Sequence, residues 1–446
     1  MTINTESYLT KKLVYFLVGV FPLFFLIGPF FLELFAILIS IYFLKEFIKN
    51  KSRFIKNYKN NYVIVIISLF CLYLIASSFF SEYWSYTIPK SFFYVRYIIF
   101  SLALAYVFEE NNKLIIYFFY SLLLTFFLLF VGSFYEIYYK SFCGYFNNSG
   151  SYIYTNDSIL CTKFSLIGSL QREDRLSSFF GNELILGSFL SRLLPLLSFL
   201  FFFIFKDKKN YYPYFFIFIF VTSIIIFLSG ERLSFFFNLI FLFMILIFYK
   251  DIFLLKLFFF ISIIFFIFFI SSISNTSEKR MFNQTFSQIL DGNSNKNEIF
   301  FFASVEHRLH GIAAYNIFLD NKIIGSGINT FRKICPKKYN IQIQKFNSCT
   351  THPHNTFLQL LSEVGILGFL FPFFLLLSVI YFFCKSLINL FLKKNTSNLF
   401  FAECCIMTCF LITLFPIIPS GNFFTNFLNY IYYLPLGFYI YFKKNI

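Results

Sequence analysis

Long apolar runs separated by short polar segments organise the whole chain. Runs of roughly the length that crosses a bilayer as a helix, about 20 residues, recur from end to end. Each run must be helical, because hydrocarbon offers no partner for free backbone groups. The pattern predicts an all-α polytopic membrane protein with twelve transmembrane helices, near 13–28, 29–44, 62–80, 92–108, 114–135, 183–205, 213–229, 233–249, 252–272, 364–384, 399–419 and 423–442.

Two long polar segments interrupt this series, at about 136–182 and 273–363. The first belongs to an amino-terminal part, 1–272, which carries spans one to nine. The second separates spans nine and ten and is long enough to fold into a small subdomain with helices of its own. Residues 364–446 then supply the last three spans.

The basic residues of the short loops predict the orientation. If the spans simply alternate, these loops share one side of the membrane, and the positive-inside rule makes that side cytoplasmic. Both termini then lie inside, and both long polar segments lie outside. One segment fits poorly, because Glu109 and Glu110 outnumber Lys113 there. The basic loop residues include Lys45, Lys49, Lys51, Arg53, Lys56, Lys59, Lys206, Lys208, Lys209, Lys385, Lys393, Lys394, Lys443 and Lys444.

Composition narrows the class of protein further. The 446 residues are 58% hydrophobic, 25% aromatic and 13% charged, with a mean hydropathy of +0.72. A soluble domain of this size has no core large enough for so much apolar surface, so the chain is expected to be an integral membrane protein. The net charge of +16 is spread over short loops, which fits contact with anionic lipid and not nucleic acid.

The cysteines of the two outer segments come in pairs. Cys143 and Cys161 share the first segment, and Cys335 and Cys349 share the second. In an oxidising compartment such pairs predict two local disulfides, with free thiols as the alternative. No cysteine or histidine spacing typical of a metal site occurs, and no nucleotide-binding loop motif is present, so neither a metal nor a cofactor is expected.

The stretch HNTFLQLLSEVGILG is the main candidate for chemistry. It places His354, which titrates near neutral pH, where the second outer segment returns to the membrane. Asn355 is placed to fix the neighbouring ring, and Gly365 and Gly368 allow a close helix contact. Glu363 is interpreted as structural. A merely structural or interfacial His354 is the alternative.

Two arginines are predicted to face the same side as His354. Arg232 lies in SGERLSF, the turn between spans seven and eight, where Glu231 is placed to hold its guanidinium. Arg308 lies in EHRLHG, within the second outer segment. The alternatives are a snorkelling Arg232 that caps a helical hairpin and a solvated Arg308 without a role.

These segments resemble the O-antigen ligase family. His354-Asn355, nine residues and then Gly365-x-x-Gly368 is similar to the family signature of histidine, Asn/Ser/Gln, nine residues and GxxG. Further similarity lies in the sequence IIGSGINTF at 323–331, in RLSSFFGNELILG at 175–187 and in SGERLSF. The resemblance covers about 170–370, with the predicted spans around it.

The resemblance implies transfer of a glycan from undecaprenyl diphosphate to an acceptor sugar, the lipid A core, at the periplasmic face of a bacterial inner membrane. It implies that His354, Arg232 and Arg308 are essential, and that Arg175 and Asn355 contribute to substrate binding. Two guanidinium groups suit the oxygens of a departing diphosphate. A histidine base assists the acceptor hydroxyl, and attack opposite the diphosphate inverts the anomeric centre without a metal.

Two alternatives remain at this stage. A polysaccharide polymerase of the same superfamily uses the same chemistry with a growing glycan as the acceptor. A transporter or flippase of twelve spans belongs to a different class, in which ionisable residues lie within the membrane. A transporter would use the intramembrane charges of Arg192 in span six and Arg96 in span four.

Overall fold

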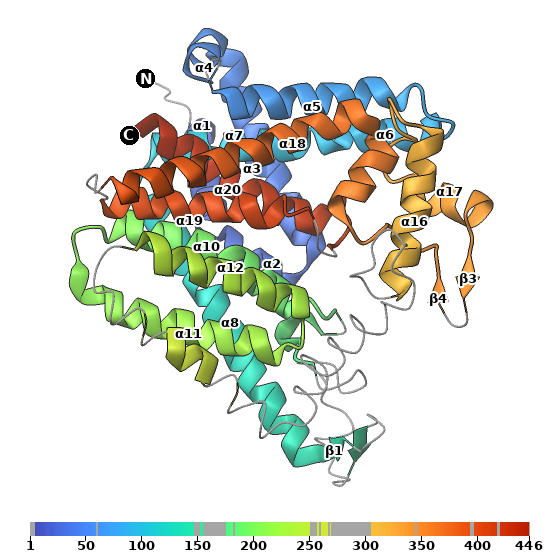
Figure 1. Cartoon of the computed structure of the whole chain (residues 1–446). Helices are drawn as coiled ribbons and strands as arrows, with labels where there is room; N and C mark the ends of the chain where they lie inside the picture. The colour runs from blue at the N-terminus through green and yellow to red at the C-terminus, as the bar shows by residue number, and fades with distance from the viewer. Residues whose placement is uncertain are drawn as a thin grey trace.

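The protein is described from a computed structural model, which is helical apart from two short hairpins (Figure 1). The structure describes residues 5–58, 61–146, 152–154, 175–181, 183–249, 257, 260–265, 268, 305–343, 346–392, 397–416 and 420–445. Its amino-terminal elements are α1 (Thr5–Val20), η1 (Phe21–Leu23), α2 (Phe24–Ile27), α3 (Pro29–Lys49), α4 (Lys51–Tyr58), α5 (Tyr62–Ser78), α6 (Trp84–Tyr94), α7 (Arg96–Glu110) and α8 (Leu114–Cys143).

The remaining elements include α16 and α17, from the second long polar segment. In chain order they are β1 (Gly144–Phe146), β2 (Tyr152–Tyr154), η2 (Ser178–Phe180), α10 (Leu186–Ile204), η3 (Lys209–Tyr211), α11 (Tyr212–Leu228), α12 (Arg232–Phe248), α16 (Val305–Asp320), α17 (Phe331–Lys338), β3 (Gln342–Ile343), β4 (Phe346–Asn347), α18 (Thr356–Phe391), α19 (Asn398–Thr413) and α20 (Asn426–Asn445). Strands β1 and β2 pair antiparallel, as do β3 and β4.

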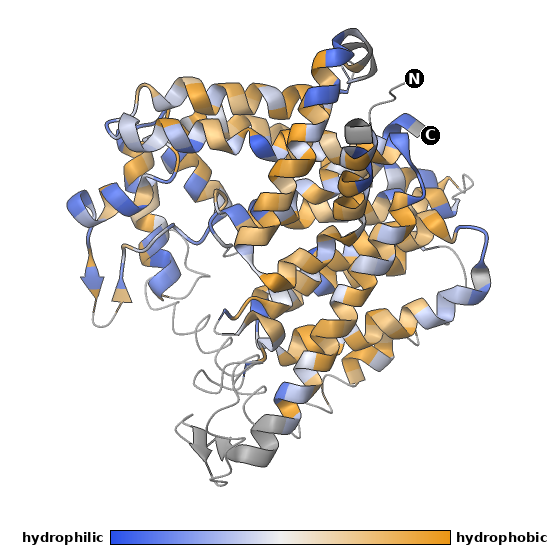
Figure 2. Cartoon of the chain, turned by 180° about the vertical axis from the view of Figure 1, so that it is seen from behind, coloured by the Kyte–Doolittle hydropathy of each residue, from blue (hydrophilic) through white to orange (hydrophobic). Residues whose placement is uncertain are grey.

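Apolar helices make the chain an integral membrane protein. Among the described residues, five helices are long and apolar enough to cross a bilayer: Tyr8–Ile27, Trp84–Glu110, Leu114–Tyr138, Leu186–Ile204 and Thr356–Phe391. Four shorter apolar helices accompany them: Tyr62–Ser78, Tyr212–Leu228, Arg232–Phe248 and Asn398–Thr413. The predicted ninth span, 252–272, lies mostly outside the described residues, so the count of twelve stays a prediction. Figure 2 shows the apolar bundle, with polar residues gathered at its ends.

Several predicted boundaries were wrong. Helix α8 continues to Cys143, well into the segment expected to be a loop after residue 135. Helix α18 begins at Thr356 and not at 364, and it is broken at Gly365. The boundary between the first two predicted spans is confirmed, since Gly28 has φ 133° and α3 starts at Pro29.

The two chain ends lie together, at the end of the bundle opposite to α16 and α17 (Figure 1). Lys11 pairs with Glu110 at 2.8 Å and Lys444 pairs with Glu109 at 2.6 Å. The acidic segment that fitted the charge pattern poorly therefore contacts lysines from both ends of the chain. This pairing places both termini and the loop after α7 on one side of the bundle.

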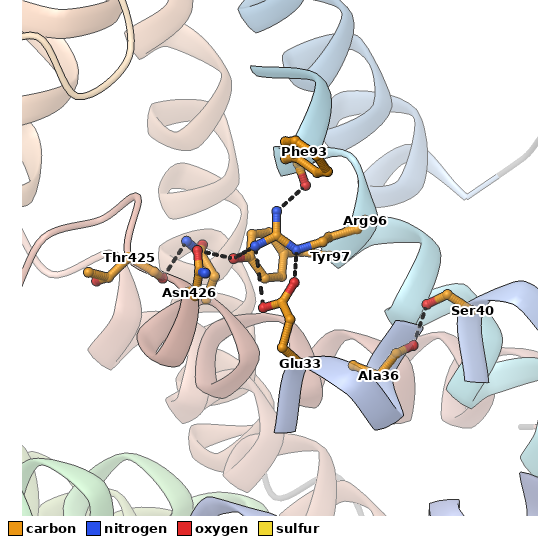
Figure 3. Close-up of polar contacts among 9 residues, drawn as sticks. Glu33, Ala36, Ser40, Phe93, Arg96, Tyr97, Thr425 and Asn426 are labelled. Atoms are coloured by element: carbon orange, nitrogen blue, oxygen red, sulfur yellow. Dashed lines mark hydrogen bonds and ion pairs between the residues drawn. The ribbon is translucent and has the colours of Figure 1, made fainter. Parts of the chain in front are cut away.

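A polar network ties α3, α7 and α20 together (Figure 3). Arg96 forms an ion pair with Glu33 and donates to the Tyr97 hydroxyl at 2.8 Å. That hydroxyl donates to Asn426 at 3.1 Å, where α20 begins. The network fixes the start of α20, and the segment just before α20 contacts the candidate site.

Candidate active site

The second outer segment is joined to α18 by reciprocal backbone hydrogen bonds. Because α18 is broken at Gly365, the carbonyls of Ser362 and Glu363 are free to accept from Ser326 and Gly327, at 3.0 and 2.8 Å. Beyond the break, Ile366 N donates to the Lys322 carbonyl at 2.9 Å. The sequence IIGSGINTF thus forms the loop that docks into the broken helix, and α17 follows directly.

The signature glycines make this close approach possible. Gly365 has φ +66°, and a Cβ there would lie 2.4 Å from the Ile323 carbonyl oxygen. Gly368 faces Tyr73 of α5, whose ring would be 2.5 Å from an added Cβ. The Tyr73 hydroxyl donates to the Val364 carbonyl at 2.7 Å. Close contact was predicted for both glycines, but Gly365 contacts a loop backbone and not a neighbouring helix.

Replacement of Gly365 by alanine is expected to lower stability. A side chain in this left-handed conformation costs about 1–3 kcal/mol, and the added Cβ also meets backbone atoms of the docked loop. The apparent Tm of the detergent-purified protein is expected to fall by several degrees. Gly19→Ala in α1 is the control, because the nearest atom to its added Cβ is 3.4 Å away. Equal melting of Gly365→Ala and the parent protein would contradict the role of this break.

All four histidines of the chain gather at the end of the bundle that carries α16 and α17. The ring of His354 lies 4.0 Å from that of His352, 5.2 Å from that of His310 and 5.3 Å from that of His307, between centroids. His307 and His310 come from α16, whereas His352 and His354 precede α18. We call these four residues the histidine cluster.

Unused hydrogen-bonding atoms point to a ligand at the histidine cluster. One ring nitrogen each of His307, His310 and His352 is buried and has no hydrogen-bond partner among the described residues. Buried polar atoms are nearly always paired, so three unsatisfied imidazole nitrogens within one cluster require an explanation. A polar substrate would satisfy them.

The backbone around His354 is held in an unusual shape. His354 has φ +54°, in the left-handed region, and its carbonyl accepts from Ser420 N at 2.7 Å. Asn355 was expected to fix the imidazole, but its side chain caps α18 by accepting from Leu358 N at 3.0 Å and donates to the Pro416 carbonyl at 3.0 Å. The contacts of Asn355 therefore position the backbone of its neighbour and the start of the helix.

Arg232 is the first residue of α12, and the turn before it is built by Glu231. Glu231 was expected to hold the Arg232 guanidinium. Its carboxylate instead accepts from the amides of Gly187 and Ser188, at 2.8 and 3.0 Å, and so caps α10. Burial raises the pKa of Glu231, and the nearby guanidinium of Arg175 opposes that rise. These hydrogen bonds hold the turn against α10. The backbone at Arg232, the first residue of α12, is thereby fixed in position.

Arg175 lies between the entry segment of α10 and this turn. Its guanidinium donates to the Leu184 carbonyl at 3.3 Å and to the Ser229 carbonyl at 3.4 Å. These contacts give Arg175 a positioning role within the described structure. Substrate contact by Arg175 stays a prediction.

The predicted catalytic set comes together at one end of the molecule. Arg308 is 9% exposed and lies on the same turn of α16 as His307 and His310. Arg232 lies close enough to His307 that its charge lowers the pKa of that imidazole, after burial, which is the larger cause. His354 contacts His307 directly. The arrangement is a partly buried cluster of imidazoles with guanidinium groups beside it.

The environment keeps these imidazoles neutral. Burial, then the neighbouring imidazoles, lower the pKa of His354 to about 3. Burial also lowers the pKa of His352 to about 4. A neutral imidazole has a lone pair that can accept a proton, so His354 is in the state that a general base needs at neutral pH.

These pKa values predict an unusual pH dependence. In the free protein His354 stays neutral as the pH falls through 6.5, the ordinary value, so kcat/KM for the donor is expected to hold well below that pH. A bound diphosphate stabilises the imidazolium form and raises the pKa. The acid limb of kcat is therefore expected at higher pH than that of kcat/KM. Coincident limbs near pH 6.5 would contradict a buried histidine base.

Part of the site was not found from the sequence. His307, His310 and His352 were not singled out, although all four histidines fall between 307 and 354. Arg332 on α17 was missed altogether, because nothing in FRKICPKK distinguishes it from the lysines beside it. The segment is stabilised by a disulfide between Cys335 and Cys349, the pair expected within this loop. The predicted pair Cys143 and Cys161 lies outside the described residues.

The two arginines of the predicted spans, Arg96 and Arg192, interact with other side chains of the bundle. Arg96 is paired with Glu33. Arg192 is 4% exposed, and its guanidinium lies over the rings of Phe237 and Tyr432, at 4.9 and 5.3 Å. Within the described residues, no group of three or more His, Cys, Asp or Glu residues is arranged to hold a metal ion.

Comparison with known families agrees with the geometry. Residues 215–373 match the O-antigen ligase family model. Over this stretch the chain is similar to the O-antigen ligase family. The match includes Arg232, Arg308, the histidine cluster and both signature glycines, and it ends within α18. Members of this family are glycan-transferring enzymes, ligases or polymerases, with lipid-linked substrates. No curated protein matches the chain.

Proposed function

We propose that this protein is an O-antigen ligase-like glycosyltransferase. It moves a glycan from undecaprenyl diphosphate to an acceptor sugar, the lipid A core, at the periplasmic face of the bacterial inner membrane. The observation that carries the proposal is the contact of His354 with the other imidazoles beside Arg232 and Arg308, within the matched domain. Both termini are then cytoplasmic.

The reaction follows from the charges of the site. His354 accepts the proton of the acceptor hydroxyl while its oxygen attacks the anomeric carbon of the donor sugar. The bond from that carbon to the diphosphate oxygen breaks, and the carrier leaves as undecaprenyl diphosphate. Arg232 and Arg308 neutralise the negative charge that develops on the leaving group. The proton then passes from His354 to water, and no metal takes part.

The bundle offers apolar surface for the carrier. Helices α5, α18, α19 and α20 enclose an apolar cavity of about 70 Å³, lined by Phe371, Phe423 and Leu436 among others. Phe423 belongs to the segment that precedes α20. Its backbone N–H donates to the side chain of Gln359, near the start of α18. The cavity is far too small for a whole polyprenyl chain. Most of the tail is expected to lie along the lipid-facing helices.

A deletion strain tests the proposed function in the cell. Loss of a ligase leaves long glycan on its lipid carrier, unattached to the lipid A core. Loss of a polymerase, the alternative within the same superfamily, leaves single repeat units attached to the core. Surface polysaccharide of the strain, separated by electrophoresis, distinguishes the two. An unchanged pattern would rule out both.

A further inference from the structure

Two guanidinium groups from different parts of the fold lie near the histidine cluster. Arg232 is beside His307, and His307 contacts the central ring, His354. His354 also contacts His352. Arg332 lies close enough to His352 for its charge to help lower the pKa of that imidazole, after burial, which is the larger cause. The disulfide Cys335–Cys349 ties α17 to the chain just before that histidine. The cluster is therefore approached by one arginine from a membrane helix and by another from the outer subdomain.

The position of Arg332 is rigidly set by its surroundings. It is the second residue of α17, and the first, Phe331, donates its backbone N–H to Glu363 at 3.1 Å. Glu363 is fully buried on α18, and Gln359 also donates to it, at 3.1 Å. A small core of Ala313, Ala314, Ile317, Phe331, Ile334 and Cys335 packs α17 against α16. Arg332 is thus held in place before any substrate binds.

Burial raises the pKa of Glu363, and the nearby charge of Arg332 opposes that rise without forming an ion pair. The Arg332 Nε is buried without a hydrogen-bond partner, and among the described residues the side chain forms no ion pair. Helix α17 contains three further cations and no acid. Two of these cations lie over aromatic rings, Lys333 over Tyr86 at 5.3 Å and Lys337 over Tyr83 at 5.1 Å. Arg332 is the cation of this helix whose charge reaches His352 of the histidine cluster.

The two arginines suit different substrates. The donor diphosphate is attached to a lipid and approaches from the bilayer, where Arg232 begins a membrane helix. The acceptor group that attacks must lie on the opposite side of the anomeric carbon. Arg332 belongs instead to α17, which lies away from the membrane helix that Arg232 begins (Figure 1). A guanidinium group binds phosphate and carboxylate oxygens through its planar fork.

We propose that Arg332 binds the acceptor, and that the acceptor sugar carries an anionic substituent, a phosphate or a carboxylate, near the hydroxyl that attacks. The inference rests on the proposed transfer reaction and names the acceptor class for the same site. His354 then lies between an anionic donor held by Arg232 and Arg308 and an anionic acceptor held by Arg332.

The experiment measures transfer kinetics with one core glycolipid acceptor in three forms: intact, dephosphorylated, and with its carboxylates reduced. A charge-assisted hydrogen bond contributes about 1.5–3 kcal/mol, or roughly a ten- to hundred-fold change in affinity. For Arg332→Gln, the KM for the intact acceptor is expected to rise by that factor, while the donor KM stays within about twofold of wild type. Removal of one anionic group from the acceptor is expected to abolish the difference between the variant and wild type, and that group identifies the substituent.

Controls separate the possible outcomes. Lys333→Gln, next to Arg332 on the same helix, is expected to behave as wild type, and Arg332→Lys is expected to keep part of the discrimination. A changed donor KM, equal effects of Arg332→Gln on all three acceptors, or wild-type protein that does not distinguish the acceptors would each overturn the inference. No donor consumption by wild-type protein with any acceptor would instead refute the proposed function. Melting temperatures of the variants show whether they are folded.

Discussion

Replacement of His354 by asparagine is expected to lower the rate of glycan transfer by about a hundred- to ten-thousand-fold, the usual contribution of a general base. Asparagine is the informative substitution because His354 has φ +54°, a conformation that asparagine tolerates better than alanine. The backbone at the start of α18 is thereby kept, and only the base is lost. The measurement is the single-turnover rate in liposomes with saturating donor and acceptor.

The control for His354 is a change elsewhere in the same cluster. His310→Gln keeps a polar side chain on α16 and leaves the proposed base in place. Its effect on the rate is expected to be much smaller than that of His354→Asn, because His310 is placed to support the central ring and not to accept the proton. Equal losses in the two variants would show that the cluster acts as a unit without a single base.

Replacement of Arg232 by glutamine is expected to reduce kcat/KM for the donor by roughly a hundred- to a thousand-fold, the range for losing a preorganised charge donor. The physical reason is the negative charge that develops on the diphosphate as its bond to the sugar breaks. Arg232→Lys is expected to recover only part of the loss, because an ammonium group lacks the planar fork. Kinetics with varied donor and fixed acceptor provide the measurement.

Lys208→Gln is a matched control for the loss of one positive charge. Lys208 is exposed, its ammonium lies 5.8 Å from the centre of the Tyr211 ring, and it is in the loop at the opposite end of α11 from Arg232. Its substitution is expected to leave transfer unchanged. If Arg232→Gln retained wild-type kcat/KM, the assignment of Arg232 to the leaving group would be wrong.

The long apolar runs predicted a polytopic helical membrane protein correctly, because hydrocarbon leaves the backbone few options. This pattern failed where a contact far away in sequence decides the local shape. Gly365 looks like a packing glycine within a continuous helix, yet the docked loop around Gly325 breaks α18 there. The end of α8 was missed for a different reason, since its aromatic last turns do not resemble a loop or a membrane span.

The site was predictable only in part, for the same physical reason. The signature stretch indicated His354, and the SGERLSF turn indicated Arg232. The capping role of Asn355 was foreseeable, because asparagine just before an apolar helix is a preferred N-cap. Neither the gathering of four imidazoles nor the place of Arg332 was foreseeable, because both depend on how α16 and α17 pack around a disulfide and a broken helix.

The most direct test of the account uses purified protein in liposomes containing an undecaprenyl diphosphate-linked glycan and a core acceptor, without ATP. The account predicts one released undecaprenyl diphosphate for each glycan transferred, with inverted configuration at the new linkage, and almost no product with His354→Asn. Retained configuration, or undiminished transfer by that variant, would contradict it.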